Sequence, residues 1–103
     1  MRRYSLGATA LSEHAPKQRV AAPGWAYLDY PGSDILMRAE TAVERRWRVT
    51  ACAKEPWTAA YVSSLGPADL LFNIGACVGS YALIAASRGA RVVCVEASPV
   101  NAA

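Results

Sequence analysis

The chain has 103 residues, of which 53% are hydrophobic and 18% are charged. This composition excludes an intrinsically disordered protein, which needs low hydrophobicity and high charge, and the length fits one small domain and excludes a multidomain enzyme. The formal net charge is +3, and charges of both signs are scattered along the chain. Because a nucleic-acid-binding protein gathers its cations on one face, no nucleic-acid partner is expected.

The three cysteines, Cys52, Cys77 and Cys94, have neither metal-ligand nor redox-motif spacing. An odd number of cysteines, with no apolar signal segment after the basic N-terminus, is typical of reduced thiols in the cytoplasm, and no metal site is expected. Residues 70–87 carry no charge, a length close to the ~20 residues of a membrane span. They contain Asn73, glycines and serines, and their periodicity changes midway, so no membrane span is expected.

The N-terminal part of the chain predicts an arm with a strand-rich end. Pro-Gly pairs punctuate the first 33 residues and favour turns, so little regular structure is expected there. Over residues 35–52 the pattern indicates a β-hairpin, because polar and apolar residues alternate over residues 46–51. The arginines of this segment then have two interpretations, a site for an anionic substrate or the solvated outer face of an edge strand, and the pattern favours the second. They are Arg45, Arg46 and Arg48.

The next segment predicts one short helix. Pro56 suits the first helical turn, and Gly66 suits the position just after the helix. Trp57, Tyr61 and Leu65 recur every four residues, so they would form one bulky apolar stripe. We expect this stripe to pack in the core.

Residues 69–103 have the pattern of a β-α-β unit. An apolar strand over residues 69–74 is followed by a glycine turn over 75–79, a helix over 80–88 and a second apolar strand over 91–96. We expect the strands to be parallel and joined by a right-handed crossover. Because both strands are apolar at nearly every position, they are expected to be buried on both faces between further strands.

The last predicted helix begins at Ser98-Pro99, where serine suits the N-cap and proline the first turn, and the sequence stops at Ala103. One helical turn is not stable by itself. We therefore expect residues 1–103 to be the N-terminal part of a larger α/β domain.

Two features of the β-α-β unit predict a nucleoside-containing cofactor at the carboxyl ends of the strands, where open parallel sheets bind ligands. Gly75 and Gly79 allow a sharp turn and a close approach of the backbone to a ligand. Glu96 follows Gly75 by 21 residues, near the ~20 typical of an acid that accepts both ribose hydroxyls of an adenosine. Dinucleotide binding needs a glycine where this chain has Cys77, so S-adenosylmethionine (SAM), which has no phosphate, is favoured over NAD.

The segment over residues 71–81, Leu-Phe-Asn-Ile-Gly-Ala-Cys-Val-Gly-Ser-Tyr, resembles motif I of the class I SAM-dependent methyltransferases in the form typical of the FkbM family. Glu55-Pro56 before a helix, and residues 95–102, resemble the flanking segments of that family. The resemblance implies a Rossmann-like SAM-binding domain over residues 54–103, cut in its second crossover helix, after an arm over residues 1–53.

The resemblance also implies roles for particular residues. Gly75, Ala76 and Gly79 would line the SAM pocket, and Glu96 would hold the ribose. Glu55 would close over the methionine end of the cofactor or serve only as a helix N-terminal charge. The implied cofactor-binding residues are Glu55, Asn73, Gly75, Ala76, Cys77, Gly79 and Glu96. Asn73 stands where the family usually has Asp, and Cys77, a turn-filling residue or a reactive thiol, stands where it often has Asn.

The implied reaction is transfer of the SAM methyl group to a hydroxyl of a small molecule or a sugar. No catalytic base is identified in the sequence, and the oligomeric state is not indicated. Two alternatives stay open. One is a non-catalytic remnant or interaction piece, and the other, less favoured because of the missing glycines, is a fragment of an NAD-linked oxidoreductase.

Overall fold

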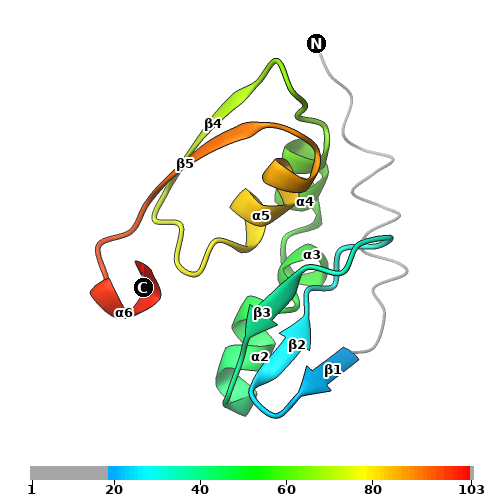
Figure 1. Cartoon of the computed structure of the whole chain (residues 1–103), viewed down its shortest axis with the longest axis vertical. Helices are drawn as coiled ribbons and strands as arrows, with labels where there is room; N and C mark the ends of the chain where they lie inside the picture. Colours follow the sequence, from blue (N-terminus) through cyan, green and yellow to red (C-terminus); the bar gives the residue numbers. More distant parts are fainter. Residues whose placement is uncertain (1–18, 103) are drawn as a thin grey trace.

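A computed structural model describes residues 19–102, which form an α/β arrangement with two small sheets (Figure 1). Residues 1–18, where the predicted irregular arm begins, lie outside the described part of the chain. In the N-terminal sheet, β1 (Arg19–Ala22), β2 (Trp25–Tyr27) and β3 (Leu36–Arg38) are antiparallel and lie in that order. Residues 19–27 are therefore more regular than expected.

The predicted β-hairpin over residues 35–52 is wrong. β3 pairs with β2, and the alternating residues 46–51 run from the end of the helix α2 (Ala42–Arg48) through a two-residue turn to the start of the helix α3 (Ala51–Lys54). A capping box begins α2: the Glu44 amide donates to Thr41 Oγ1 at 3.1 Å, and the Thr41 amide donates to Glu44 Oε2 at 3.3 Å. This Thr-x-x-Glu signature marks a helix start, whereas a six-residue alternation is too short to exclude a helix.

Helix α4 (Pro56–Ser63) lies where the sequence predicts it, with proline in its first turn. Its packing face differs from the expected stripe, because Trp57 and Tyr61 are exposed and only Leu65 of the stripe is buried. The buried positions of α4 are small: Ala59, Ala60 and Val62. Small side chains let α4 approach α5 (Ser80–Ser87) closely, so the expectation that both aromatics pack in the core is wrong.

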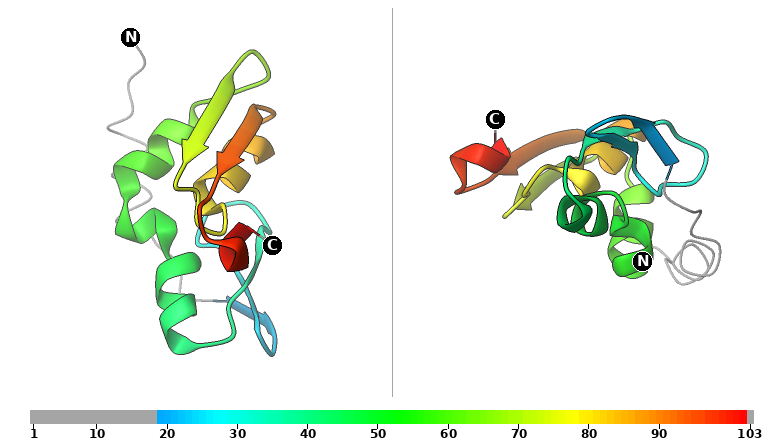
Figure 2. Two further views of the ribbon diagram at one scale, coloured as in Figure 1. Left: turned by 90° about the vertical axis from the view of Figure 1, so that its left-hand side faces the viewer. Right: turned by 90° about the horizontal axis from the view of Figure 1, so that it is seen from below.

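The predicted β-α-β unit is present as β4 (Leu70–Ile74), α5 and β5 (Arg91–Val95), and its two strands are parallel. Figure 2 shows β4 and β5 side by side and pointing the same way, with α5 behind them. A short helix, α6 (Pro99–Ala102), follows β5. Within residues 19–102, no helix is both long enough and apolar enough for a membrane crossing.

Only one face of the β4–β5 sheet is covered by the residues that the structure describes. Leu71 and Val92 pack against the core. The opposite face carries five large apolar side chains that are 43–72% exposed, namely Leu70, Phe72, Ile74, Val93 and Val95. Within residues 19–102 the expected burial of these strands is therefore present on one face and absent from the other.

One hydrophobic core runs from the N-terminal sheet to the β-α-β unit. Its largest fully buried side chains are Leu28, Val49, Cys52 and Ile84. Polar contacts also join residues before and after position 53: Tyr30 Oη is hydrogen-bonded to Ser63 Oγ, and Ser80 Oγ donates to the Arg48 carbonyl at 2.9 Å. The residues on either side of position 53 therefore share one core.

Candidate functional site

Backbone hydrogen bonds hold the turn between β4 and α5 against the end of β5. The amides of Gly75 and Ala76 both donate to the Val95 carbonyl, at 2.8 and 3.0 Å. The φ angles of Gly75, Cys77 and Gly79 are +70°, +54° and +85°. This left-handed region is open to glycine and costs other residues ~1–2 kcal/mol, so Cys77 is a strained position in the turn.

Glu96 follows β5 directly, and its carboxylate is fixed to the turn. Oε1 accepts a hydrogen bond from the Ser98 amide at 2.8 Å, and Oε2 accepts one from the Cys77 amide at 2.5 Å. These backbone donors, Ser98 foremost, lower the pKa of Glu96 below its ordinary value. The side chain is therefore an ionised acceptor at neutral pH, and lone pairs remain on both oxygens for ligand donors.

A pocket of about 320 Å³, here called the turn pocket, lies between the glycine turn and Glu96. This volume is within the range of about 300–1,000 Å³ that is typical of small-molecule sites. Its lining residues are Ala76, Cys77, Val78, Gly79, Cys94, Glu96, Asn101 and Ala102. The structure thus brings together four of the residues that the sequence analysis selected, Ala76, Cys77, Gly79 and Glu96.

Three other selected residues lie outside the lining of the turn pocket. At Gly75 an added Cβ would meet no atom within 4 Å, so there is open space beside the start of the turn. Asn73 lies in β4, and its buried Nδ2 has no hydrogen-bond partner within residues 19–102. Glu55 lies between α3 and α4, where its Oε2 accepts a hydrogen bond from Tyr81 Oη at 2.7 Å. Burial, and then the Glu55 carboxylate, raise the pKa of Tyr81, so this phenol stays a donor.

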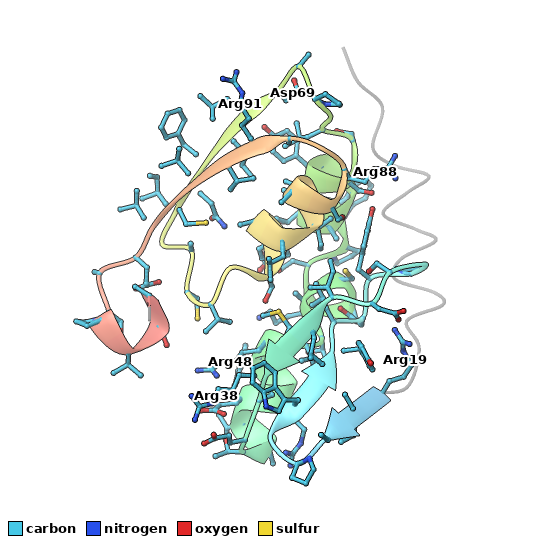
Figure 3. All side chains as sticks on the ribbon, viewed as in Figure 1. Arg19, Arg38, Arg48, Asp69, Arg88 and Arg91 are labelled. Atoms are coloured by element: carbon cyan, nitrogen blue, oxygen red, sulfur yellow. The ribbon has the colours of Figure 1, made fainter. Side chains whose placement is uncertain are left out.

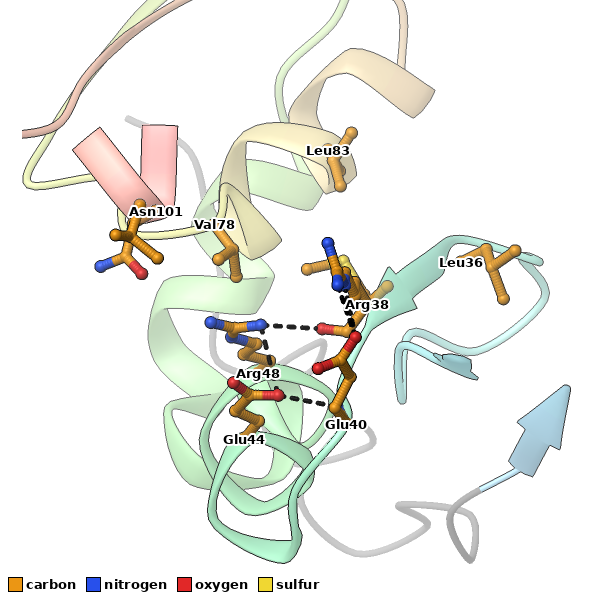
Figure 4. Close-up of a pocket in the computed structure, with 10 residues that line it drawn as sticks. Leu36, Arg38, Glu40, Glu44, Arg48, Val78, Leu83 and Asn101 are labelled. Atoms are coloured by element: carbon orange, nitrogen blue, oxygen red, sulfur yellow. Dashed lines mark hydrogen bonds and ion pairs between the residues drawn. The ribbon is translucent and has the colours of Figure 1, made fainter. Parts of the chain in front are cut away.

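A second pocket, of about 380 Å³ and here called the charged pocket, shares Val78 and Asn101 with the turn pocket. Four of its lining side chains are charged, and they come from β3, α2 and the residues between them (Figure 4). They are Arg38, Glu40, Glu44 and Arg48. Of the three arginines that the sequence offers for an anionic substrate, only Arg48 lines this pocket. The pocket itself was not predicted, because a hairpin was expected here, although the Thr-x-x-Glu signature puts Glu44 and Arg48 one turn apart on a helix.

The arginines labelled in Figure 3, all within residues 19–102, are spread over different sides of the molecule. Figure 3 shows Arg38 and Arg48 near each other, whereas Arg88 and Arg91 lie toward the opposite end of the molecule and Arg19 lies on a different side. Within residues 19–102, no three His, Cys, Asp or Glu side chains are grouped as metal ligands would be.

Comparisons of the chain with protein families, with curated proteins and with solved structures find no match.

Proposed function

We propose that the chain binds SAM in the turn pocket and is the cofactor-binding part of a SAM-dependent methyltransferase with a Rossmann-like fold. One observation carries this proposal: an ionised Glu96, anchored to a glycine turn, lies where two parallel strands end. Open parallel sheets bind their ligands at this edge. The resemblance of residues 71–81 to methyltransferase motif I agrees with it.

The residues present fit the chemical groups of SAM. Glu96 would accept hydrogen bonds from the ribose hydroxyls, because Cys77 and Ser98 occupy only part of its acceptor capacity. The open space at Gly75 would admit the methionine portion. Asn73 would have to turn its amide toward the cofactor, because its Nδ2 is buried and Asn73 does not line the turn pocket.

SAM, when bound, supplies a methyl group that is electrophilic because its sulfur is positively charged. The proposed acceptor is a hydroxyl oxygen of a small molecule or a sugar, which would become a methyl ether and lose its proton to solvent, with S-adenosylhomocysteine as the second product. The chain would contribute by fixing the cofactor in place, since correct positioning alone accounts for a large part of many rate enhancements.

Isothermal titration of the chain with SAM and with NAD⁺ tests this proposal. We expect SAM to bind and NAD⁺ not to bind, because Cys77 places a side chain where a pyrophosphate needs a bare glycine. Glu96→Gln should weaken SAM binding about tenfold or more, since it removes a charged acceptor. Asp34→Asn is the matched control, because Asp34 is an exposed carboxylate whose partner is Arg19.

Two outcomes would contradict the proposal. Tighter binding of NAD⁺ than of SAM would favour the oxidoreductase. Binding of neither ligand would favour a non-catalytic interaction piece.

A further inference from the structure

The charged pocket combines apolar walls with two acid–base pairs. Leu36, Val78, Leu83 and Val100 contribute apolar side chains, and the partly exposed charged side chains lie among them (Figure 4). Pockets that bind small molecules commonly have this make-up, in which apolar surface supplies contact and a few polar groups orient the ligand.

Both carboxylates of the pocket already have donors. Arg38 donates to Glu40 Oε1 from Nε at 2.9 Å and from Nη2 at 2.5 Å. Glu44 Oε2 accepts from the Glu40 amide at 2.7 Å and from the Thr41 amide at 3.3 Å. These backbone donors lower the pKa of Glu44, so its charge is stabilised without help from a ligand.

Arg48 is the charged group of the pocket that has an adjacent pair of unused donors. Its side chain is 17% exposed, the least of the four. Within residues 19–102 only Nη1 is engaged: it donates to the Arg38 carbonyl at 3.1 Å and lies 3.7 Å from Glu44 Oε2. In Figure 4 both dashed lines of Arg48 start from one nitrogen of this guanidinium. Nε and Nη2 form a planar pair of donors, which matches the two oxygens of a carboxylate.

The backbone position of Arg48 is fixed by the element that begins at the glycine turn. Ser80 Oγ, at the start of α5, donates to the Arg48 carbonyl at 2.9 Å. Val78 and Asn101 line both pockets. A molecule whose carboxylate is held by Arg48 therefore lies beside the turn pocket.

We propose that the charged pocket binds the carboxylate of a small organic acid with an apolar body. This assignment rests on the proposed function, and together with it makes the methyl acceptor a hydroxy acid. The carboxylate pairs with Nε and Nη2 of Arg48, the apolar body lies against Val78 and Leu83, and the hydroxyl is directed toward the cofactor.

NMR titration of the chain with benzoate, benzamide and inorganic phosphate, without SAM, tests the pocket directly. Benzoate should shift the amide signals of Val78 and Leu83 saturably. Benzamide, which has the same shape without the charge, should bind with an affinity lower by about tenfold or more. Phosphate should also bind more weakly, because it makes no use of the apolar wall.

Variants on α2 locate the site. Arg48→Gln should weaken benzoate binding about tenfold or more, because it removes the charged pair of donors. Arg46→Gln removes the same charge from the same helix outside the pocket and should leave the affinity unchanged. The comparison of benzoate with benzamide uses the unaltered chain, so it decides the question even where Arg48→Gln does not fold.

The proposal is overturned if benzamide or phosphate binds as well as benzoate, or if both arginine variants lose affinity equally. SAM binding is measured separately, so its failure would remove the proposed function and leave the carboxylate pocket standing. SAM affinity is then repeated with saturating benzoate. Unchanged or tighter SAM binding is expected of an acceptor site, and competition between the two would overturn the acceptor role.

Discussion

Asp29 caps helix α3 from a distant place in the sequence. Its buried carboxylate accepts the amides of Cys52 and Ala53, each at 2.9 Å. Thr50, which occupies the N-cap position of α3, makes no side-chain cap of its own. A single side chain thus satisfies two amides that the helix geometry leaves without partners.

Replacement of Asp29 by alanine would leave these two amides without acceptors. We expect Asp29→Ala to lower the free energy of unfolding by about 2–4 kcal/mol, measured by urea denaturation. Asp34→Ala is the control, because its ion pair with Arg19 is exposed and should change stability by less than about 1 kcal/mol. Similar losses in the two variants would argue against the capping role.

Glu96 makes the free energy of unfolding depend on pH. Its folded-state pKa lies below the ordinary value of 4.5, so the folded state favours the ionised form. The resulting stabilisation is present above the unfolded pKa and is lost as the pH falls through the folded pKa. We expect the difference in unfolding free energy between the wild type and Glu96→Gln to shrink as urea titrations move from neutral pH to below pH 4.5. A difference that stays constant would contradict the expectation.

At the scale of elements, Gly89 shows how tightly α5 is joined to the chain before β4. Gly89 ends α5 with a φ of +89°, and an added Cβ would lie 3.1 Å from Pro67 Cγ. Gly32 has a φ of +75° with no atom within 4 Å of such a Cβ. Both glycines have a left-handed backbone conformation, and only at Gly89 would an added Cβ also be crowded.

This pair of glycines separates backbone strain from crowding. Gly32→Ala should lose ~1–2 kcal/mol of stability from the left-handed conformation alone, and Gly89→Ala should lose more. Thermal denaturation of both variants measures the difference. Equal losses would mean that Pro67 moves aside without cost.

The sequence predicts some elements well because their signals are local. Gly75, Gly79 and two apolar runs define the β-α-β unit within one continuous stretch. β1 and β2 have four and three residues, too few to establish a period of two. The direction in which Trp57 points depends on α5, which packs against the small residues of α4, and no periodicity within α4 contains that information.

For the molecule as a whole, the continuous core means that the N-terminal sheet and the β-α-β unit should unfold together. Ile84 lies in α5 with no exposed surface and belongs to the same core as Leu28. We expect Ile84→Ala to lower the free energy of unfolding by about 2–5 kcal/mol and to shift one shared transition.

Far-UV circular dichroism and tryptophan fluorescence, recorded during urea denaturation, check this cooperativity. Trp25 lies in β2 of the N-terminal sheet, and Trp57 lies in α4, which packs against α5 of the β-α-β unit. Val20→Ala, on the exposed β1, is the control and should shift the midpoint little. Separate transitions for the two probes would contradict a common core.

The two pockets differ in how far the sequence can predict them. The turn pocket is formed chiefly by one β-α-β unit, so Ala76, Gly79 and Glu96 can be selected from their spacing. The charged pocket forms where Arg48 meets Val78, and these residues lie on parts of the chain that only the tertiary fold brings together. Their proximity depends on the contact between the end of α2 and the start of α5, where Ser80 Oγ donates to the Arg48 carbonyl, and the sequence carries no local signal for this contact.

The arrangement of the three thiols equips the protein for site-selective labelling. Cys77 and Cys94 are exposed and line the turn pocket, whereas Cys52 is fully buried. Burial, and then the nearby Asp29, raise the pKa of Cys52, which keeps it protonated and unreactive. A thiol-directed fluorophore would therefore attach beside the proposed cofactor site of the native chain without any substitution. The third thiol would become reactive only on unfolding, so one reagent would report both ligand occupancy and loss of the core.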